Sequence, residues 1–192
     1  GNKIVVERLV LGGVAISSLF GAIQASLLLQ VEDGRIQAAL NWLIGSLNAR
    51  GWEEIKFVTL PILISLFIGL FLSRQLNLLG LGDELSVSLG NSLFRSRCLI
   101  GAIATLLTAC AVSIGGLIGF IGLIVPHFSR LLIGSDFKYI LPFSALMGAL
   151  TLSSSDLISR LGPVEIPVGI VTALIGAPIF IFILYQKTGQ KK

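Results

Sequence analysis

The chain has 192 residues, of which 54% are hydrophobic and 12% are charged, and its mean hydropathy is +0.94. A soluble protein of this length spreads charge over its surface, whereas the charges here lie between long apolar runs. The composition therefore excludes an ordinary soluble domain and indicates an integral membrane protein. The net charge of +4 comes without interleaved basic and aromatic residues, so nucleic-acid binding is not expected.

Six apolar segments follow one another along the chain, and each is a candidate membrane span, since about 20 apolar residues cross roughly 30 Å of hydrocarbon. They are residues 9–31, 55–73, 98–114, 117–132, 140–161 and 164–186. The mixed stretch 32–54 contains Trp42 and Trp52, and because tryptophan favours the membrane–water boundary, it predicts a short interfacial helix. The sequence thus predicts an all-α polytopic transmembrane helical bundle of about six spans, forming one domain over residues 1–192.

The basic residues predict the orientation of this bundle. Six crossings would place both termini, the 74–97 loop and the 130–138 region in one compartment. That compartment would hold ten of the 14 basic residues: Lys3, Arg8, Arg74, Arg95, Arg97, Arg130, Lys138, Lys187, Lys191 and Lys192. Arg35, Arg50, Lys56 and Arg160 would lie opposite. Cytoplasmic loops carry the excess of Lys and Arg, so the side with ten basic residues is predicted to be cytoplasmic.

Few groups in the chain could do chemistry. Cys98 and Cys110 would lie roughly 18 Å apart along one helix, too far for a disulfide, and metal-ligand spacing such as CxxC is absent. The Lys-Thr pair at 187–188 follows no GxxxxGK[ST] pattern, so nucleotide binding is not expected. We expect neither a cofactor nor an enzymatic activity of the chain itself.

Asp156 is the only ionisable residue clearly inside a predicted span, near its outer end. An ion-coupled transporter usually keeps several such residues in its spans, so this mechanism is disfavoured. The serine-rich cluster at 153–156 is interpreted either as a polar cluster that bonds a neighbouring helix or as part of a substrate path. Energy for any transport is then expected to come from a partner.

The segment 74–97 is the interior stretch least suited to lipid. It has leucines at 76, 78, 79, 81, 85 and 89, glycines at 80, 82 and 90, and two acidic residues, Asp83 and Glu84, that could begin a short helix. Such an apolar but loop-like segment indicates a docking surface for a cytoplasmic partner. An interfacial helix lying on the bilayer would give the same pattern, and the residues alone leave both interpretations open.

Four long segments carry a resemblance to a known family. They are LVLGGVAISSLF near the start, NWLIGSL, LNLLGLGDELSVSLG, and the run from GFIGLIVPHFSRLLIGSD to GAPIFIFIL at 119–184. In this order they resemble the C-terminal half of the permeases of ABC importers for iron-siderophores, haem and vitamin B12. The resemblance covers nearly the whole chain.

The resemblance implies a permease of about ten helices that pairs with a second copy or a homologue in the bacterial cytoplasmic membrane. It also implies a cytoplasmic ABC ATPase dimer and an extracytoplasmic substrate-binding protein as partners. Coupling to the ATPase would then involve Leu76, Leu79, Leu81, Gly82, Asp83, Glu84, Leu89 and Gly90. Arg160 matches a position that presents a basic residue to the binding protein.

The same resemblance gives an expectation for Pro126, His127 and Arg130. Pro126 is expected to end or kink the short fourth helix at the cytoplasmic surface. His127 and Arg130 are then expected in the headgroup zone or against the ATPase.

This chain departs from the family in the number of spans, because it would begin near the fifth of ten. Residues 9–52 would correspond to the fifth helix and a short gating helix, and the N-terminal spans are expected to be missing. The sequence therefore predicts a permease subunit, or part of one, of an importer for an iron chelate, haem or cobalamin. The alternative is a polytopic membrane scaffold that binds partners but transports nothing.

Overall fold

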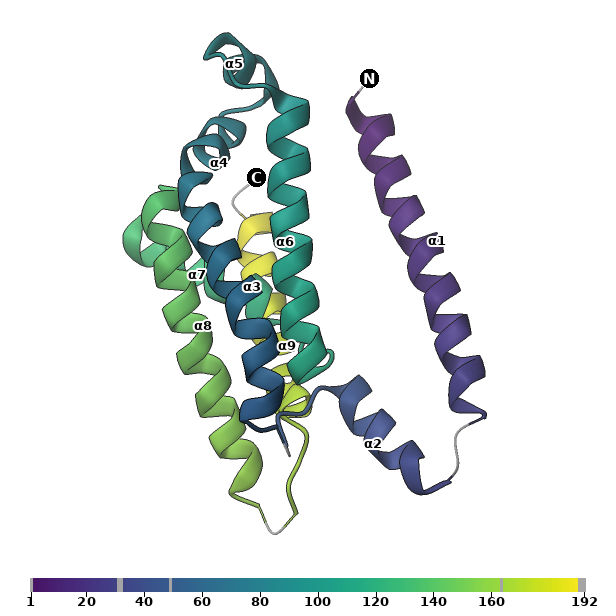
Figure 1. Cartoon of the computed structure of the whole chain (residues 1–192). Helices are drawn as coiled ribbons and strands as arrows, with labels where there is room; N and C mark the ends of the chain where they lie inside the picture. The colour runs from purple at the N-terminus through teal and green to yellow at the C-terminus, as the bar shows by residue number, and fades with distance from the viewer. Residues whose placement is uncertain (1, 31–32, 49, 163, 190–192) are drawn as a thin grey trace. The chain divides into compact units, whose positions relative to one another are not determined.

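The computed structural model describes residues 2–30, 33–48, 50–162 and 164–189 of the chain. Within these ranges it has nine helices and no strand, which confirms the all-α prediction (Figure 1). The helices are α1 (Asn2–Leu28), α2 (Asp33–Ile44), α3 (Trp52–Phe71), α4 (Ser73–Gly80), α5 (Asp83–Ser88), α6 (Leu93–Gly115), α7 (Ile121–Ile133), α8 (Phe137–Arg160) and α9 (Val168–Gly189).

The chain divides into two compact units, residues 1–41 and 42–192. Unit 1 contains α1, whose described side chains from Val10 onward are mostly exposed and apolar, and most of α2. Unit 2 contains the end of α2 and all later helices. Unit 2 holds the segments on which most site predictions fall.

Five helical segments are long and apolar enough to cross a membrane: Val10–Leu28, Trp52–Phe71, Leu93–Gly115, Phe137–Arg160 and Val168–Tyr185. The remaining predicted span forms α7, which has 13 residues and is about 20 Å long. Residues 116–120 precede α7 without forming a helix. Hydrogen bonds at the residues that flank the whole segment 116–133 lie at opposite ends of unit 2. Ser46 N–H donates to the carbonyl of Gly115 at 2.9 Å at one end, and Asn77 bonds Asp136 at 2.8 Å at the other.

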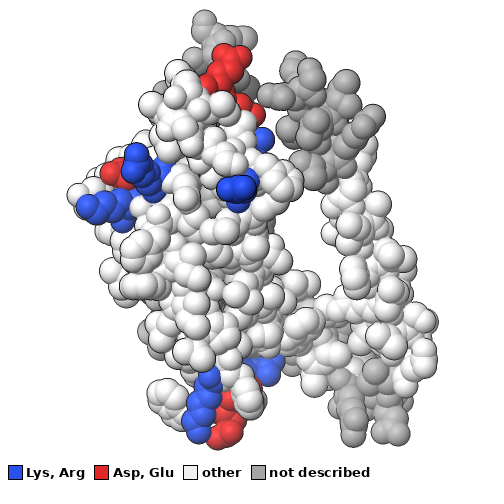
Figure 2. Space-filling view, turned by 45° about the horizontal axis from the view of Figure 1, so that its top comes forward, with Lys and Arg blue, Asp and Glu red and all other residues white. Residues whose placement is uncertain are grey.

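Unit 2 has two ends, which lie opposite each other (Figure 1). The α5 end comprises residues 73–97 and 130–138. The Arg160 end comprises the described residues 42–48, 50–56, 160–162 and 164–169. Figure 2 shows charged side chains at both ends and an uncharged band between them, as expected for a unit whose middle lies in hydrocarbon.

The core of unit 2 consists largely of small residues. Ser65 of α3, Ser129 of α7, Ser155 of α8 and Thr172 of α9 are all buried, whereas many large apolar side chains face outward. Three of these hydroxyls, those of Ser129, Ser155 and Thr172, donate to carbonyls three or four residues earlier in their own helices. Small side chains that satisfy their own polar groups let helices approach closely in a membrane, where the hydrophobic effect between helices is weak.

A close approach at the Arg160 end depends on Gly169, the second residue of α9. Its N–H donates to the carbonyl of Gly45 at 2.9 Å. A methyl group added there would overlap the carbonyl oxygen of Ile44 and lie 2.9 Å from the carbonyl carbon. Only glycine therefore lets α9 begin directly against the loop that follows α2.

Candidate functional site

The α4–α5 region is a turn between two short helices with fixed backbone geometry. Gly82, between the helices, has φ +97° and ψ +162°, a conformation essentially restricted to glycine. Gly90, just after α5, has φ +81°. These two glycines from the predicted coupling set therefore bracket α5, and Asp83 and Glu84 occupy its first turn.

A chain of hydrogen bonds holds α5 to the start of α6. Asn91 donates to the hydroxyl of the fully buried Ser86 at 2.8 Å, and the Ser96 hydroxyl donates to Asn91 at 2.6 Å. Arg97 also pairs with Asp83 at 2.6 Å. Because these polar groups bond one another, the turn is held without help from a partner. No sequence motif predicted this network.

The outer side of this turn is apolar. Leu81, Leu85, Val87 and Leu89 are each between 54% and 58% exposed. We call these four side chains the α5 apolar surface. Leu81 and Leu89 belong to the predicted coupling set. Leu85 was counted among the leucines of the segment but not in that set, and Val87 was missed. The sequence signal for this surface is the alternation of apolar residues 85, 87 and 89 with serines, one of which is the buried Ser86.

Other members of the predicted set lie elsewhere. Leu76 and Leu79 belong to α4, which packs against α8, and both side chains are only partly exposed. They therefore contribute less to an outer surface than Leu81 and Leu89 do.

Asn77 on α4 anchors this region to the beginning of α8. Its amide nitrogen donates to the Asp136 carboxylate at 2.8 Å, and its amide oxygen accepts from Phe137 N–H at 3.0 Å. Asp136 also accepts from Lys138 N–H at 2.9 Å as the N-cap of α8. The bond from Asn77, followed by the one from Lys138 N–H, lowers the pKa of the Asp136 carboxyl below its usual value. No sequence pattern indicated this contact between residues 59 positions apart.

Of the two alternatives expected for Pro126, that it ends α7 or kinks it, the structure excludes the first. The helix does not end there but continues to Ile133, and Gly134 with φ +89° follows it as the C-cap. Arg130 lies in the last turn, as expected of a cation near a helix C-terminus. His127 is half-buried, and the Arg130 guanidinium stacks 5.2 Å from the centre of the Phe137 ring.

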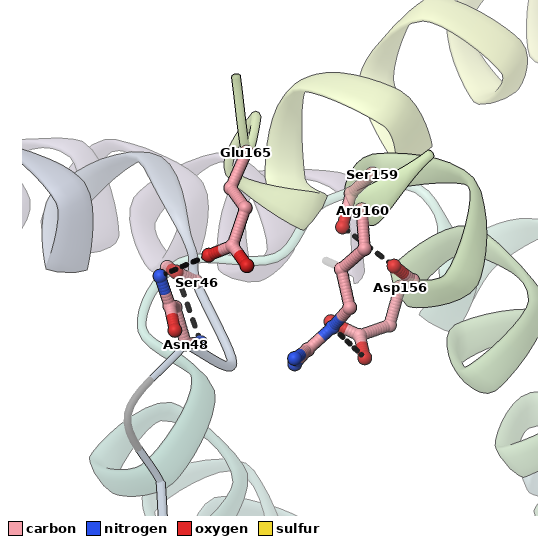
Figure 3. A network of polar contacts seen from close by, with 6 residues as sticks. All are labelled: Ser46, Asn48, Asp156, Ser159, Arg160 and Glu165. Carbon is pink, nitrogen blue, oxygen red and sulfur yellow. Dashed lines mark hydrogen bonds and ion pairs between the residues drawn. The ribbon is translucent and has the colours of Figure 1, made fainter. Parts of the chain in front are cut away.

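The Arg160 end carries a polar network (Figure 3). Arg160 forms two bonds to the Asp156 carboxylate one turn earlier on α8, at 2.9 and 3.3 Å. The Ser159 hydroxyl donates to the carbonyl of Asp156 at 2.7 Å. Asp156 thus pairs within its own helix, and the predicted bond from this cluster to a neighbouring helix is not the contact that forms. The Arg160 side chain is still 44% exposed, so part of it is open to a partner.

A second contact in Figure 3 connects two loops. Asn48, in the loop between α2 and α3, donates to the carboxylate of Glu165 at 2.5 Å. Ser46 accepts from Asn48 N–H at 3.2 Å and itself bonds Gly115 through its N–H. Together with the bond from Gly169 to Gly45, these contacts hold residues 45–48 against the beginning of α9. Sequence analysis did not single out Asn48 or Glu165.

Comparison with known proteins identifies the family. The FecCD transport family matches residues 1–186. The cobalamin import system permease protein BtuC of Halobacterium salinarum is 41% identical over 180 residues, covering 93% of this chain and 48% of that protein. The hemin transport system permease protein HmuU of Yersinia pestis is 37% identical over 188 residues, covering 97% and 56% respectively.

A solved inward-facing structure of an ABC transporter assigned to the metal-chelate type is also similar. The TM-score is 0.84 at 38% sequence identity, and the match covers 91% of this chain and 57% of that one. The chain thus spans about half the length of the relatives it matches. Because the family match extends over nearly all of its residues, the chain belongs to the FecCD transport family.

Proposed function

We propose that the chain forms the membrane-spanning part of a permease in an ABC importer, and that a separate cytoplasmic ATPase supplies the energy. Its cargo would be an iron chelate, haem or cobalamin, the classes named for the relatives from H. salinarum and Y. pestis and for the Fe(3+)-citrate import permease YfmE of Bacillus subtilis. Five helical segments suited to a membrane support the location, which we propose is the cytoplasmic membrane. In this role the chain itself catalyses no reaction.

The observation that carries the proposal is the α5 apolar surface. Four exposed apolar side chains on a turn held by internal hydrogen bonds form a surface suited to burial against a partner. The basic residues at the same end, Arg74, Arg95 and Lys138 among them, favour its placement in the cytoplasm. The partner proposed for this surface is the ABC ATPase, with Leu81 and Leu89 in the contact.

Force on this turn has a direct route into the helices. The α4 helix continues from α3 with one residue between them and bonds the start of α8 through Asn77. The α5 helix is tied to α6 by Asn91 and Ser96. Movement of the ATPase would therefore be passed to α3, α6 and α8 together, as a rigid-body change between outward- and inward-open states.

At the opposite end we propose that Arg160 contacts an acidic residue of the substrate-binding protein. Its remaining exposure supports this, although Asp156 already occupies one edge of its guanidinium. Completion of the pathway would require the N-terminal spans of a full permease and a second permease copy or homologue. A membrane scaffold that transports nothing is the alternative.

The test is co-purification from cells that express the chain with its ATPase and binding protein. Leu81→Asp places a charge in the proposed contact and should abolish ATPase recovery. Leu29→Asp is the matched control, because Leu29 is 89% exposed and lies in the other unit. Full ATPase recovery with Leu81→Asp would exclude the α5 apolar surface as the contact. ATPase recovery without ligand-stimulated hydrolysis would favour the scaffold.

A further inference from the structure

A cavity between α7 and α9 lies near the α5 end of unit 2. It has a volume of about 260 Å³, and its lining includes Gly122, Pro126, His127, Arg130, Phe180 and Ile183. The α7 side supplies the chain's one histidine and an arginine, whereas the α9 side is apolar. The cavity therefore has a cationic side and a hydrocarbon side.

Arg130, the positive charge at this cavity, forms no ion pair with any acidic residue that the structure describes. The ion pairs among the described residues are Lys56–Glu53, Arg97–Asp83 and Arg160–Asp156, and none includes Arg130. The acidic group nearest in sequence, Asp136, is bonded by Asn77 and by Lys138 N–H. Phe137 supports the face of the Arg130 guanidinium, which leaves the N–H donors at its edge for an anion.

Pro126 adds a polar group to the same wall. A helical residue at this position would donate its N–H to the carbonyl of Gly122, but proline has no N–H. Gly122 lines the same cavity as His127 and Arg130, and because residue 126 is proline its carbonyl lacks the usual helical partner. An acceptor in a cavity that also holds the Arg130 cation suits a ligand that carries both an anion and a hydroxyl group.

The depth of the cavity indicates what such a ligand is attached to. The described part of α9 that is suited to a membrane is Val168–Tyr185, and the sequence turns polar at Gln186 and Lys187, so Phe180 and Ile183 lie within about two turns of the end of the apolar run. Arg130 lies in the last turn of α7. The cationic and apolar walls therefore meet where hydrocarbon gives way to headgroups, and basic pockets between helices at that depth suit anionic lipid headgroups.

We propose that this cavity binds the phosphate of an anionic phospholipid, with phosphatidylglycerol as the probe. Arg130 and His127 contact the phosphate, the glycerol hydroxyl reaches the carbonyl of Gly122, and the acyl chains lie along Phe180 and Ile183. A phosphodiester joined to hydrocarbon matches both walls, whereas an acidic side chain of a soluble partner matches only one. The site is independent of which cargo the permease carries.

The test is native mass spectrometry of the purified chain after exchange into mixed phosphatidylglycerol and phosphatidylcholine with identical acyl chains. Phosphatidylglycerol should be retained preferentially. Arg130→Gln should weaken its retention about tenfold, because it removes a charge-assisted hydrogen bond. Arg95→Gln is the matched control, since Arg95 is exposed at the same end but does not line the cavity, and it should retain the lipid.

A second variant fills the cavity without removing charge. A side chain at Gly122 meets nothing within 4 Å at its first carbon, so Gly122→Leu should fold and still displace the lipid. Equal retention of the two lipids would overturn the proposal, and so would equal losses with Arg130→Gln and Arg95→Gln. Displacement of the lipid by excess inorganic phosphate with no acyl-chain dependence would identify a free-phosphate site instead. Lost ATPase recovery with unchanged lipid retention in Arg130→Gln would assign the cavity to a protein partner.

Discussion

Replacing Gly169 by alanine tests whether the close contact at the Arg160 end determines the stability of unit 2. The added methyl group would overlap the carbonyl oxygen of Ile44 and lie 3.2 Å from that of Gly45. Relief requires α9 to move away from this loop, which breaks the bond from Gly169 N–H to Gly45 O. Both consequences should destabilise the folded state.

The magnitude follows from these two effects. Overpacking a close contact costs roughly 1–3 kcal/mol. Leaving a buried N–H and carbonyl unpaired costs a similar amount, roughly 1–3 kcal/mol. Because movement of α9 relieves the first cost as it causes the second, the two do not add, and the expected loss is about 1–3 kcal/mol. For a chain of this length that lowers the melting temperature by roughly 2–12 °C.

Thermal unfolding in detergent, followed by loss of the monodisperse peak in size-exclusion chromatography, measures the effect. Gly148→Ala in α8 is the matched control, because a methyl group there meets nothing within 4 Å. This control should remain within about 1 kcal/mol of the parent, on the stabilising side expected for Gly→Ala in a helix. A Gly169→Ala melting temperature equal to that of the control would refute the assigned role of this contact.

Three further changes probe the other contacts. Arg160→Glu should reduce stimulation of the ATPase by the binding protein and leave basal hydrolysis unchanged in a reconstituted transporter; unaltered stimulation would remove Arg160 from the docking contact. Asp136→Ala removes the N-cap of α8 and should lower the melting temperature at neutral pH. The lowered pKa of Asp136 means that its stabilisation is present above the unfolded value near 3.8 and is lost as pH falls through the folded value, so parent and variant should converge in melting scans below pH ~4; a constant difference would contradict this linkage. Asn91→Ala should leave the buried Ser86 hydroxyl unpaired and speed amide hydrogen exchange across α5, and unchanged protection would show that this network does not hold the turn.

The long apolar runs predicted the spans well because the physical requirement is simple. A helix in hydrocarbon needs a minimum length and few charges, and both can be counted from sequence. The predicted loop at 74–97 likewise contains α4, α5 and the first residues of α6. The ion pair between Asp156 and Arg160 could also have been predicted from the sequence, because residues four apart lie on the same face of a helix.

The ends of α7 could not be predicted in the same way. Pro126 was expected to end or kink the helix, but the helix continues past it and ends at Gly134, whose positive φ supplies the stop. At its other end Phe120 adopts φ +66°, which is unusual for an aromatic residue. Its side chain contacts the position of Gly176 and stacks edge-on with Phe180, so packing against α9 determines that backbone geometry.

The division of the leucines between α4 and the α5 apolar surface depended on packing as well. Leu76 and Leu81 are leucines of the same segment, so the sequence does not distinguish them. Leu76 lies on α4, which packs against α8, whereas Leu81 follows α4 and is exposed. The contact between Asn77 and Asp136 has no local signal, because both residues are common in turns and caps. Sequence alone identified the region of the candidate site, and tertiary contacts decided which side chains face outward.

The hydrogen-bonded turn around Ser86 has a thermodynamic consequence for any protein that docks there. Since Asn91 and Ser96 already satisfy its polar groups, association does not have to order this backbone or desolvate unpaired amides. The entropy penalty is then confined to overall immobilisation and to a few leucine and valine rotamers. Calorimetry of docking should show a negative heat-capacity change, as for burial of apolar area, without the large opposing entropy of coupled folding. Affinity would then depend on how well a partner's surface fits four aliphatic side chains. An ordered apolar surface of this kind can bind and release a partner repeatedly without refolding.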